Sequence, residues 1–215
     1  KVPQQRDLSH LVFEVTTLGT GAALPARGRY PTAQLLNVRD ELYLIDCGEG
    51  TQERLRMAGV NFNRIGRIFI SHMHGDHYLG LMGLLSSMHL QGRSRELHVH
   101  GPADLKEVVH LQLRVSQTYL RYPMHIHAVA SVSGEVIMED DRVTVTALAL
   151  KHRLPCTGLV VKERAGLRSL RKEMLPVIPA YRRAGVKQGE DLVAEDGTVI
   201  PNAELTLDPP ARRSY

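Results

Sequence analysis

The chain has 215 residues, of which 43% are hydrophobic, and a formal net charge of +4 at pH 7. This apolar content is enough for a sizeable core and excludes a chain that is disordered throughout. No apolar run approaches the 18 or so residues that cross a bilayer, and residues 1–6 lack the apolar stretch of a signal peptide. Two cysteines, Cys47 and Cys156, exclude a disulfide framework. We therefore expect a cytoplasmic protein with no membrane partner.

Strand and helix signals alternate through the first half of the sequence. Short apolar runs predict strands, and longer runs with apolar residues at helical spacing predict helices. The predicted strands span residues 11–18, 33–38, 42–45, 67–70 and 97–99, and the predicted helices span residues 51–58, 79–88 and 103–117. This order predicts an α/β fold.

The second half of the sequence begins with strands and then changes character. Alternating or β-branched runs predict strands at residues 126–129, 135–138, 143–150 and 159–162. Residues 162–187 then hold eight basic and two acidic residues, a local net charge of +6, with two prolines that argue against a continuous helix. We expect a core over residues 1–161, a basic arm over 162–190 and a return to the core over 191–215.

One loop concentrates residues that bind metals. The predicted strand at residues 67–70 leads directly into Ser71-His72-Met73-His74-Gly75-Asp76-His77. Imidazole nitrogens and carboxylate oxygens suit zinc, and manganese or iron less selectively. Alternate side chains of such a loop can face one point while the next turn faces a second, as two-metal hydrolysis requires. A single histidine near a strand end is usually structural, but four potential ligands within six residues favour a metal site.

The loop lacks a third nitrogen for the first of these two points. His152 stands two residues beyond the predicted strand at residues 143–150, and is a candidate for that position. Taken alone it would be an ordinary surface histidine.

These motifs resemble a known family. The histidine loop after an Ile-Phe-Ile strand resembles the metallo-β-lactamase superfamily. More narrowly, the sequence is similar to ribonuclease Z, a family of tRNA 3′-processing endonucleases, in four segments that occur in order: Leu18-Gly19-Thr20-Gly21-Ala22, Asp46-Cys47-Gly48-Glu49-Gly50-Thr51-Gln52, the histidine loop and His100-Gly101-Pro102. The late basic segment supports the narrower resemblance.

The resemblance implies a fold and a set of site residues. The fold is an αββα sandwich with a dinuclear zinc site at one edge of the sheets and a protruding basic arm. The implied zinc ligands are His72, His74 and His152 on one ion and Asp76 and His77 on the other. Asp76 would also orient or deprotonate the attacking water, and Asp46 would bond to the ligand side chains. From the sequence alone, Asp46 could instead cap the glycine turn that follows it.

The resemblance also implies an RNA partner and a homodimer. In the family a flexible arm grips the body of the tRNA, and a basic loop lies near its 3′ end; basic side chains at such places neutralise phosphates without reading sequence. The corresponding residues are Arg27 and Arg29 in the loop, and Arg164, Arg168, Arg171, Lys172, Arg182 and Arg183 in the arm. The alternatives are an ordinary basic turn and a solvated amphipathic segment.

The family pattern continues beyond the last residue of this sequence. It places there an aspartate that bridges both metals, a histidine that acts as acid and a last histidine ligand, so we expect the C-terminal third of the fold to be absent. The predicted function is a zinc-dependent endoribonuclease that cleaves precursor tRNA at the 3′ side of the acceptor stem and removes the 3′ trailer. The alternatives are another hydrolase of the superfamily, such as a phosphodiesterase acting on a small substrate, and an incomplete tRNA-binding subunit.

Overall fold

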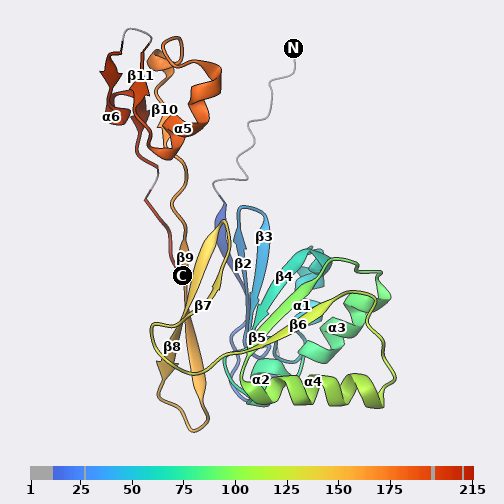
Figure 1. The fold of residues 1–215 in the computed structure, drawn as a ribbon. Helices are drawn as coiled ribbons and strands as arrows, with labels where there is room; N and C mark the ends of the chain where they lie inside the picture. Colours follow the sequence, from blue (N-terminus) through green and yellow to red (C-terminus); the bar gives the residue numbers. More distant parts are fainter. Residues whose placement is uncertain (1–11, 27, 195–196, 210) are drawn as a thin grey trace. The chain divides into compact units, whose positions relative to one another are not determined.

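The computed structural model describes residues 12–26, 28–194, 197–209 and 211–215 (Figure 1). It divides the chain into two compact units. The first extends to Val161 and includes Tyr215, and the second comprises residues 162–214. Residues 191–214, which the sequence analysis assigned to the core, thus lie in the second unit. The physical reason is that they supply the partners of its short sheets and part of its apolar core.

A six-stranded sheet forms the centre of the first unit, with its strands in sequence order. The first three strands pair antiparallel, and the third strand then begins a run of four parallel strands. The strands are β1 (Phe13–Gly19), β2 (Ala33–Val38), β3 (Glu41–Ile45), β4 (Ile65–Phe69), β5 (Leu97–Gly101) and β6 (Met124–Ala128). Because the parallel strands all point the same way, the loops that follow β3 and β4 meet at one edge of the sheet.

Helices cover one face of this sheet (Figure 1). They are α1 (Thr51–Met57), α3 (Leu81–Leu90) and α4 (Ala103–Val115), and a 3₁₀ turn, η2 (Phe62–Arg64), precedes β4. Each helix buries an apolar side chain against the strands, for example Leu55, Leu84 and Leu105. Burial of such side chains stabilises the layer by about 1.5–3 kcal/mol each.

A three-stranded sheet covers part of the opposite face. It consists of β7 (Val136–Glu139), β8 (Val143–Leu150) and β9 (Cys156–Glu163). The inward residues Val143 and Val145 of β8 alternate with less buried threonines and pack with Tyr43 and Phe69 of the central sheet. The first unit thus has a helix layer and two sheet layers, which confirms the predicted α/β fold.

The helix predicted over residues 79–88 begins two residues later, at Leu81, after a break at residues 79–80. A short helix, α2 (Gly75–Tyr78), ends before Leu79, which is 57% exposed although the spacing predicted that it faces the core. The reason is a close backbone approach: the Gly80 N–H donates to the Cys47 carbonyl at 2.9 Å, and a Cβ on Gly80 would lie 2.1 Å from the Gly48 oxygen. The interruption holds the histidine loop against the loop that follows β3.

The second unit is built from short elements, and the two prolines of residues 162–187 argued against a continuous helix there. Two antiparallel strand pairs join β10 (Ser169–Leu170) to β13 (Thr206–Leu207) and β11 (Leu192–Val193) to β12 (Val199–Ile200). The helical segments are η3 (Lys172–Met174), η4 (Ala180–Arg182), α5 (Arg183–Gln188) and α6 (Asn202–Leu205). Ile178, Val186, Leu192 and Leu205 form the unit's own apolar core.

None of the helices in the described part of the chain is long and apolar enough to cross a membrane.

Candidate metal centre

The histidine loop lies at the carboxyl edge of the central sheet. It follows β4 directly, and residue Asp46 follows β3, the parallel neighbour of β4. The Asp46 N–H donates to the Phe69 carbonyl at 2.7 Å, so the two strand ends are in register. His152 reaches the same region from the end of β8, in the second sheet. Two sheets therefore supply the side chains of one site.

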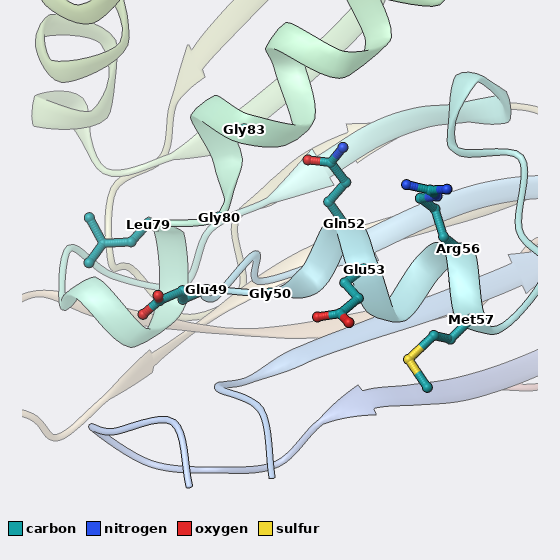
Figure 2. A pocket seen from close by; sticks show the side chains of 9 residues that line it. All are labelled: Glu49, Gly50, Gln52, Glu53, Arg56, Met57, Leu79, Gly80 and Gly83. Atoms are coloured by element: carbon teal, nitrogen blue, oxygen red, sulfur yellow. The ribbon is translucent and has the colours of Figure 1, made fainter. Parts of the chain in front are cut away.

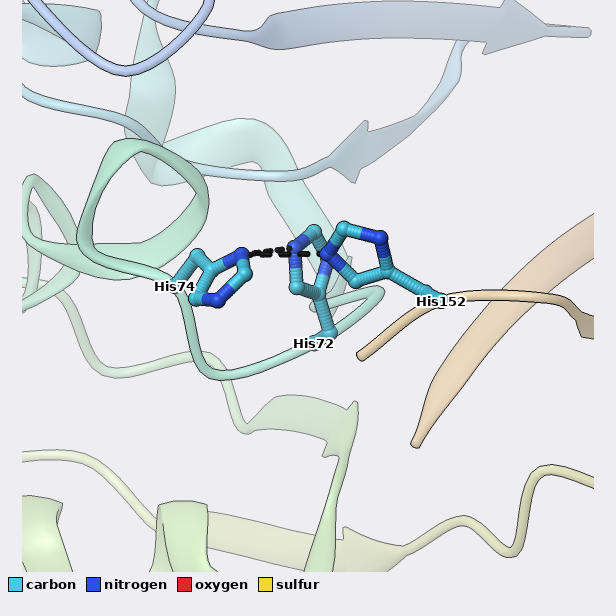
Figure 3. A group of neighbouring side chains, drawn as sticks. All are labelled: His72, His74 and His152. Carbon is cyan, nitrogen blue, oxygen red and sulfur yellow. Dashed lines mark hydrogen bonds between the residues drawn. The ribbon is translucent and has the colours of Figure 1, made fainter. Parts of the chain in front are cut away.

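Three imidazole nitrogens converge in the first unit (Figure 3). One ligand atom from each of His72, His74 and His152 lies within 4.8 Å of the other two. His74 Nδ1 is 3.0 Å from His72 Nε2 and 3.1 Å from His152 Nε2. His72 is buried and His152 is exposed, so the nitrogens face a point that is accessible from solvent.

The donor set fits zinc. Zinc–nitrogen bonds of about 2.0–2.1 Å in a tetrahedron require nitrogens about 3.3 Å apart, close to the two shorter separations above. Burial, together with the neighbouring imidazoles of His77, His152 and His74, lowers the pKa of His72 to about 4. His72 is therefore neutral at pH 7, the form in which imidazole binds a metal. Cys47, the residue after Asp46, is not a thiolate ligand for the metal at neutral pH, because burial raises the pKa of its thiol to about 12.

Asp76 and His77 face each other beside these three nitrogens. His77 Nε2 lies 3.6 Å from Asp76 Oδ2, and the Ala23 N–H donates to the same oxygen at 2.8 Å. Burial opposes ionisation of Asp76, but the Ala23 amide and the nearby His77 outweigh it, so the pKa of this carboxyl lies below its usual value. A charged carboxylate and an imidazole nitrogen form the donor pair that a second divalent ion would use.

Asp46 bonds to the histidine loop. Its backbone has φ +56°, a left-handed conformation that Asp tolerates better than most residues. Its Oδ1 accepts from the Ser71 N–H at 2.9 Å, and its Oδ2 lies 2.7 Å from His77 Nδ1. Burial alone lowers the pKa of His77, but this hydrogen bond and the charge of Asp46 raise it overall. The carboxylate contacts are thus across the site rather than in the glycine turn, the other possibility that the sequence left open.

Two contacts at the site were missed by the sequence analysis. One is the Ala23 amide on Asp76, and the other is the Ser71 hydroxyl, which touches three site residues. Ala23 gave no chemical signal, because a backbone N–H is available from almost any residue type. Ser71 gave one: a hydroxyl directly before the first histidine of the loop.

The segment whose Ala23 N–H bonds to Asp76 continues into the basic turn. Ala26 and Arg29 exchange backbone hydrogen bonds of 3.1 and 2.8 Å, and Arg29 is exposed. Arg27, the other predicted RNA contact in this turn, lies outside the described residues. Arg29 is therefore six residues from Ala23, whose N–H donates to the predicted catalytic carboxylate of Asp76.

Several predicted RNA-binding residues of the second unit have partners inside that unit. Arg168 pairs with Asp208 at 2.6 Å and donates to Thr206 Oγ1 at 2.7 Å. Arg183 donates to two backbone carbonyls, at 3.1 and 3.2 Å, and so closes the turn before α5. Arg171 is half-buried and lies 3.9 Å from Glu173. These three cations contribute to the structure of the unit.

Other cations of the second unit face outward. Lys172 and Arg164 are exposed, and half-buried Arg182 lines a cavity of about 630 Å³ beside the exposed ring of Tyr181. Within the described part of the chain, the side chains of Lys172 and Arg182 form no hydrogen bond or ion pair. Both are therefore available to an anionic partner.

A cleft of about 740 Å³ lies in the first unit between α1 and the turn that joins α2 to α3 (Figure 2). Its lining combines charged side chains such as Glu53 and Arg56 with the exposed apolar side chains of Met57 and Leu79. None of the converging histidines lines it, so it is separate from the metal centre.

Comparison with known sequences gives consistent matches. A ribonuclease Z of Bacteroides fragilis is 41% identical over 207 residues, which cover 94% of this chain and 68% of the relative. A ribonuclease Z of a Nostoc species is 40% identical over 198 residues, which cover 90% of this chain and 61% of the relative. The chain therefore spans about two thirds of the length of these curated relatives.

Solved structures agree with the sequence matches. The short form of human tRNase Z has a TM-score of 0.63 and 33% identity, with 68% of this chain and 64% of that chain covered. The metallo-β-lactamase fold protein YhfI of Bacillus subtilis has a TM-score of 0.54 at 19% identity, with 76% and 65% covered, which shows a shared fold.

A family model adds a third match, and it covers a shorter stretch. The model described as Anti-Pycsar protein Apyc1 matches residues 13–167, which include all five predicted metal ligands. It ends near the start of the second unit. By these matches the chain belongs to the Anti-Pycsar protein Apyc1 family over residues 13–167 and, over nearly its whole length, to the ribonuclease Z family, with the metallo-β-lactamase fold.

Proposed function

We propose that this protein is a zinc-dependent endoribonuclease that cleaves precursor tRNA at the 3′ side of the acceptor stem and removes the 3′ trailer. The observation that carries the proposal is the convergence of three imidazole nitrogens within 4.8 Å in a chain that is 41% identical to a ribonuclease Z. Cleavage on this side leaves a 3′-hydroxyl on the tRNA. Because the chain spans two thirds of that relative, the activity of the whole protein is part of the proposal.

The proposed metal ligands are His72, His74 and His152 for one zinc ion and Asp76 and His77 for a second. Bound zinc would supply charge for the scissile phosphate and lower the pKa of a water molecule. The protein contributes the orientation of the ligands. Asp46 holds His77 through Nδ1 at 2.7 Å, which leaves Nε2 free to face the second metal position.

Asp76 is the proposed catalytic carboxylate. Its lowered pKa keeps it ionised at neutral pH, and the Ala23 amide fixes one of its oxygens at 2.8 Å. The other oxygen can accept a hydrogen bond from the attacking water, which orients the water and can take its proton. The same residue therefore serves as ligand and as water-positioning group.

RNA binding by the second unit is supported by its cations. Lys172, Arg164 and Arg182 are the proposed phosphate contacts, together with Arg29 in the turn beside the site and with Arg27, which lies outside the described residues. Arg168, Arg171 and Arg183 remain in the proposed set, but their contacts within the unit make them supports of this surface first. Phosphate contacts of this kind position the RNA without reading its sequence.

A homodimer and a cytoplasmic location complete the proposal. In the dimer, the second unit of one copy would serve the metal centre of the other. The exposed Met57 and Leu79 side chains in the cleft of Figure 2 are apolar surface that a second copy would cover. A reducing compartment agrees with the two free, buried cysteines.

A second candidate function is hydrolysis of a small substrate, such as a small phosphodiester. The observation that favours it is the Apyc1 family model, which matches the metal centre and ends at residue 167, so that most of the second unit lies outside the match. Against it, the ribonuclease Z match extends over 94% of the chain. A tRNA-binding subunit without catalysis is the third possibility, and the convergence of the ligands speaks against it, since binding does not require them.

The test uses the purified protein loaded with zinc and two substrates. We expect a precursor tRNA with a labelled 3′ trailer to be cut once, after the acceptor stem. Bis(4-nitrophenyl) phosphate is the small phosphodiester for comparison. Cleavage of the small diester with an intact precursor would support the second candidate. Tight binding of the precursor with neither substrate cleaved would support the tRNA-binding subunit.

A further inference from the structure

The hydroxyl of Ser71 lies at the centre of the contacts behind the metal centre. Ser71 Oγ is 3.1 Å from Asp46 Oδ2, 3.0 Å from His72 Nδ1 and 3.1 Å from His77 Nδ1. It therefore touches one proposed ligand of each metal position and the carboxylate behind both. Its own N–H is held by Asp46 Oδ1 at 2.9 Å, which fixes the position of the serine.

The hydrogen atoms at this centre can be assigned by counting donors. Asp46 Oδ2 accepts from His77 Nδ1–H at 2.7 Å, the shortest of these contacts, and from the Ser71 hydroxyl. A serine hydroxyl has one hydrogen and two lone pairs. Since that hydrogen goes to the carboxylate, the oxygen is an acceptor toward His72 Nδ1, which must then carry a hydrogen. His72 Nε2 is left with a lone pair, and this is the nitrogen that lies 3.0 Å from His74 Nδ1.

We propose that Ser71 is a positioning residue that links Asp46 to His72: its hydroxyl donates to the Asp46 carboxylate and accepts from His72 Nδ1–H. This hydrogen bond fixes the Nδ1–H tautomer of His72, and the Nε2 lone pair therefore faces the metal position. Asp46 thus orients His77 directly and His72 through Ser71. One carboxylate sets the tautomers of a ligand in each of the two metal positions. The proposal rests on the metal-binding part of the proposed function and does not depend on the substrate.

Cys156 is the other group near His72 Nδ1. Its Sγ lies 3.7 Å from that nitrogen, against 3.0 Å for the Ser71 oxygen. A thiol sulfur is a weak acceptor, so the serine is the better partner for the imidazole N–H. If Ser71 is the partner of His72, Ser71→Ala should weaken zinc binding and Cys156→Ala should not. If Cys156 is the partner, the reverse is expected.

The first measurement is zinc affinity by competition with a chelator. Ser71→Ala is expected to weaken zinc binding about 10–100-fold, the usual range for loss of a group that holds a ligand. Ser71→Thr keeps the hydroxyl and should restore affinity to within about threefold. Cys156→Ala should change affinity less than threefold. A serine in α3 gives the matched control: within the described residues, the hydroxyl that Ser86→Ala removes bonds only to the backbone carbonyl of Met82, at 2.8 Å.

The second measurement reports the tautomer itself. In zinc-free protein labelled with ¹⁵N, we expect the imidazole nitrogen shifts of His72 to show Nδ1–H, and Ser71→Ala to show a mixture that includes Nε2–H. Wild-type protein with Nε2–H, or Ser71→Ala with wild-type affinity, would overturn the proposal. A Cys156→Ala loss as large as that of Ser71→Ala would overturn it too. If the protein binds zinc as described but leaves precursor tRNA intact, the proposed substrate fails and the role of Ser71 stands.

Discussion

The histidine loop and the basic segment over residues 162–187 were both singled out from sequence, but their side chains behave differently. In the loop, residue type and spacing predicted a convergence that the structure has: one nitrogen from each of His72, His74 and His152 lies within 4.8 Å of the other two. In the second unit, composition identified a basic segment, yet Arg168 and Arg183 are bonded within the unit and only some cations face outward. The spacing of residues in a loop limits where their side chains can lie. The number of basic residues in a segment, in contrast, does not show which of them are paired with acidic or polar groups.

This difference has a physical origin. Alternate residues of a loop anchored by a buried strand project to the same side. The side chains of a few neighbouring residues are therefore held close together in space. The partners of Arg168, in contrast, come from residues 206 and 208, almost 40 positions later. Acidic residues that neutralise a basic segment can thus be distant in sequence. The predictions below test each side of this comparison.

The largest expected effect concerns the loop. His74→Ala removes the nitrogen that lies 3.0–3.1 Å from both of its partners, and should weaken zinc binding by more than about 100-fold, since loss of a group behind a ligand already costs 10–100-fold. Because His74 is only half-buried, the melting temperature of the zinc-free protein should hardly change. Zinc content after dialysis and a melting curve are the measurements. His110→Ala, at an exposed position on α4, is the control, and equal zinc content in both variants would contradict the site.

The next prediction concerns a basic residue that supports the second unit. Arg168→Ala removes an ion pair with the exposed Asp208 and a charge-assisted hydrogen bond to the buried Thr206 hydroxyl. Bonds to charged groups contribute about 1.5–3 kcal/mol, so amide hydrogen exchange at Leu170 and Arg171 should accelerate by about 10–150-fold. Exchange in β4 of the first unit should stay as in the wild type. Unchanged exchange at Leu170 would show that Arg168 is free to serve RNA instead.

How much was predictable follows from the same contrast. The strands β2 and β8 were predicted with their observed bounds, because alternating or continuous apolar runs ended at clear turn residues. The break at Gly80 was missed, since a helical pattern does not show that a glycine must approach the Gly48 backbone. At the site, the convergence of the three histidines was predictable from their residue type and position. The Ala23 amide was not, because main-chain donors depend on tertiary placement.

A third prediction concerns the outward-facing cations. Replacing Lys172 and Arg182 with alanine should weaken precursor-tRNA binding about 20-fold at 0.15 M salt, and lower the slope of log affinity against log salt by roughly 0.7–0.9 for each lost contact. Hydrolysis of a small phosphodiester should not change. Binding measured by filter retention from 50 to 300 mM salt checks this, with Lys106→Ala on α4 as an exposed lysine control. An equal loss on both substrates would assign these residues to support of the active site.

The smallest expected effect concerns a buried histidine outside the metal centre, in contrast to the histidines of the loop. His100 on β5 is 5% exposed, stacks on Phe69 and His127 at 4.8 and 4.5 Å, and has no hydrogen-bond partner on either ring nitrogen within the described residues. Burial, aided by the nearby His127, Arg67 and His98, lowers its pKa from 6.5 to about 3. A depressed pKa means that the unfolded chain takes up a proton below pH 6.5 while the folded chain does not, so stability falls as the pH drops from 6.5 toward 3.

This linkage makes the acid sensitivity of the fold measurable at one residue. Between pH 7 and 5.5, His100 should account for a loss of about 1 kcal/mol in the free energy of unfolding. In His100→Phe, which keeps a stacked ring and cannot be protonated, that share of the loss should vanish. Urea unfolding of the chain at both pH values gives the difference, and His110→Phe should retain the wild-type slope. If His100→Phe loses as much stability as the wild type, then a buried histidine outside the loop contributes nothing to acid sensitivity. The acid response would in that case come from other groups, such as His72 of the metal centre, whose pKa burial also lowers.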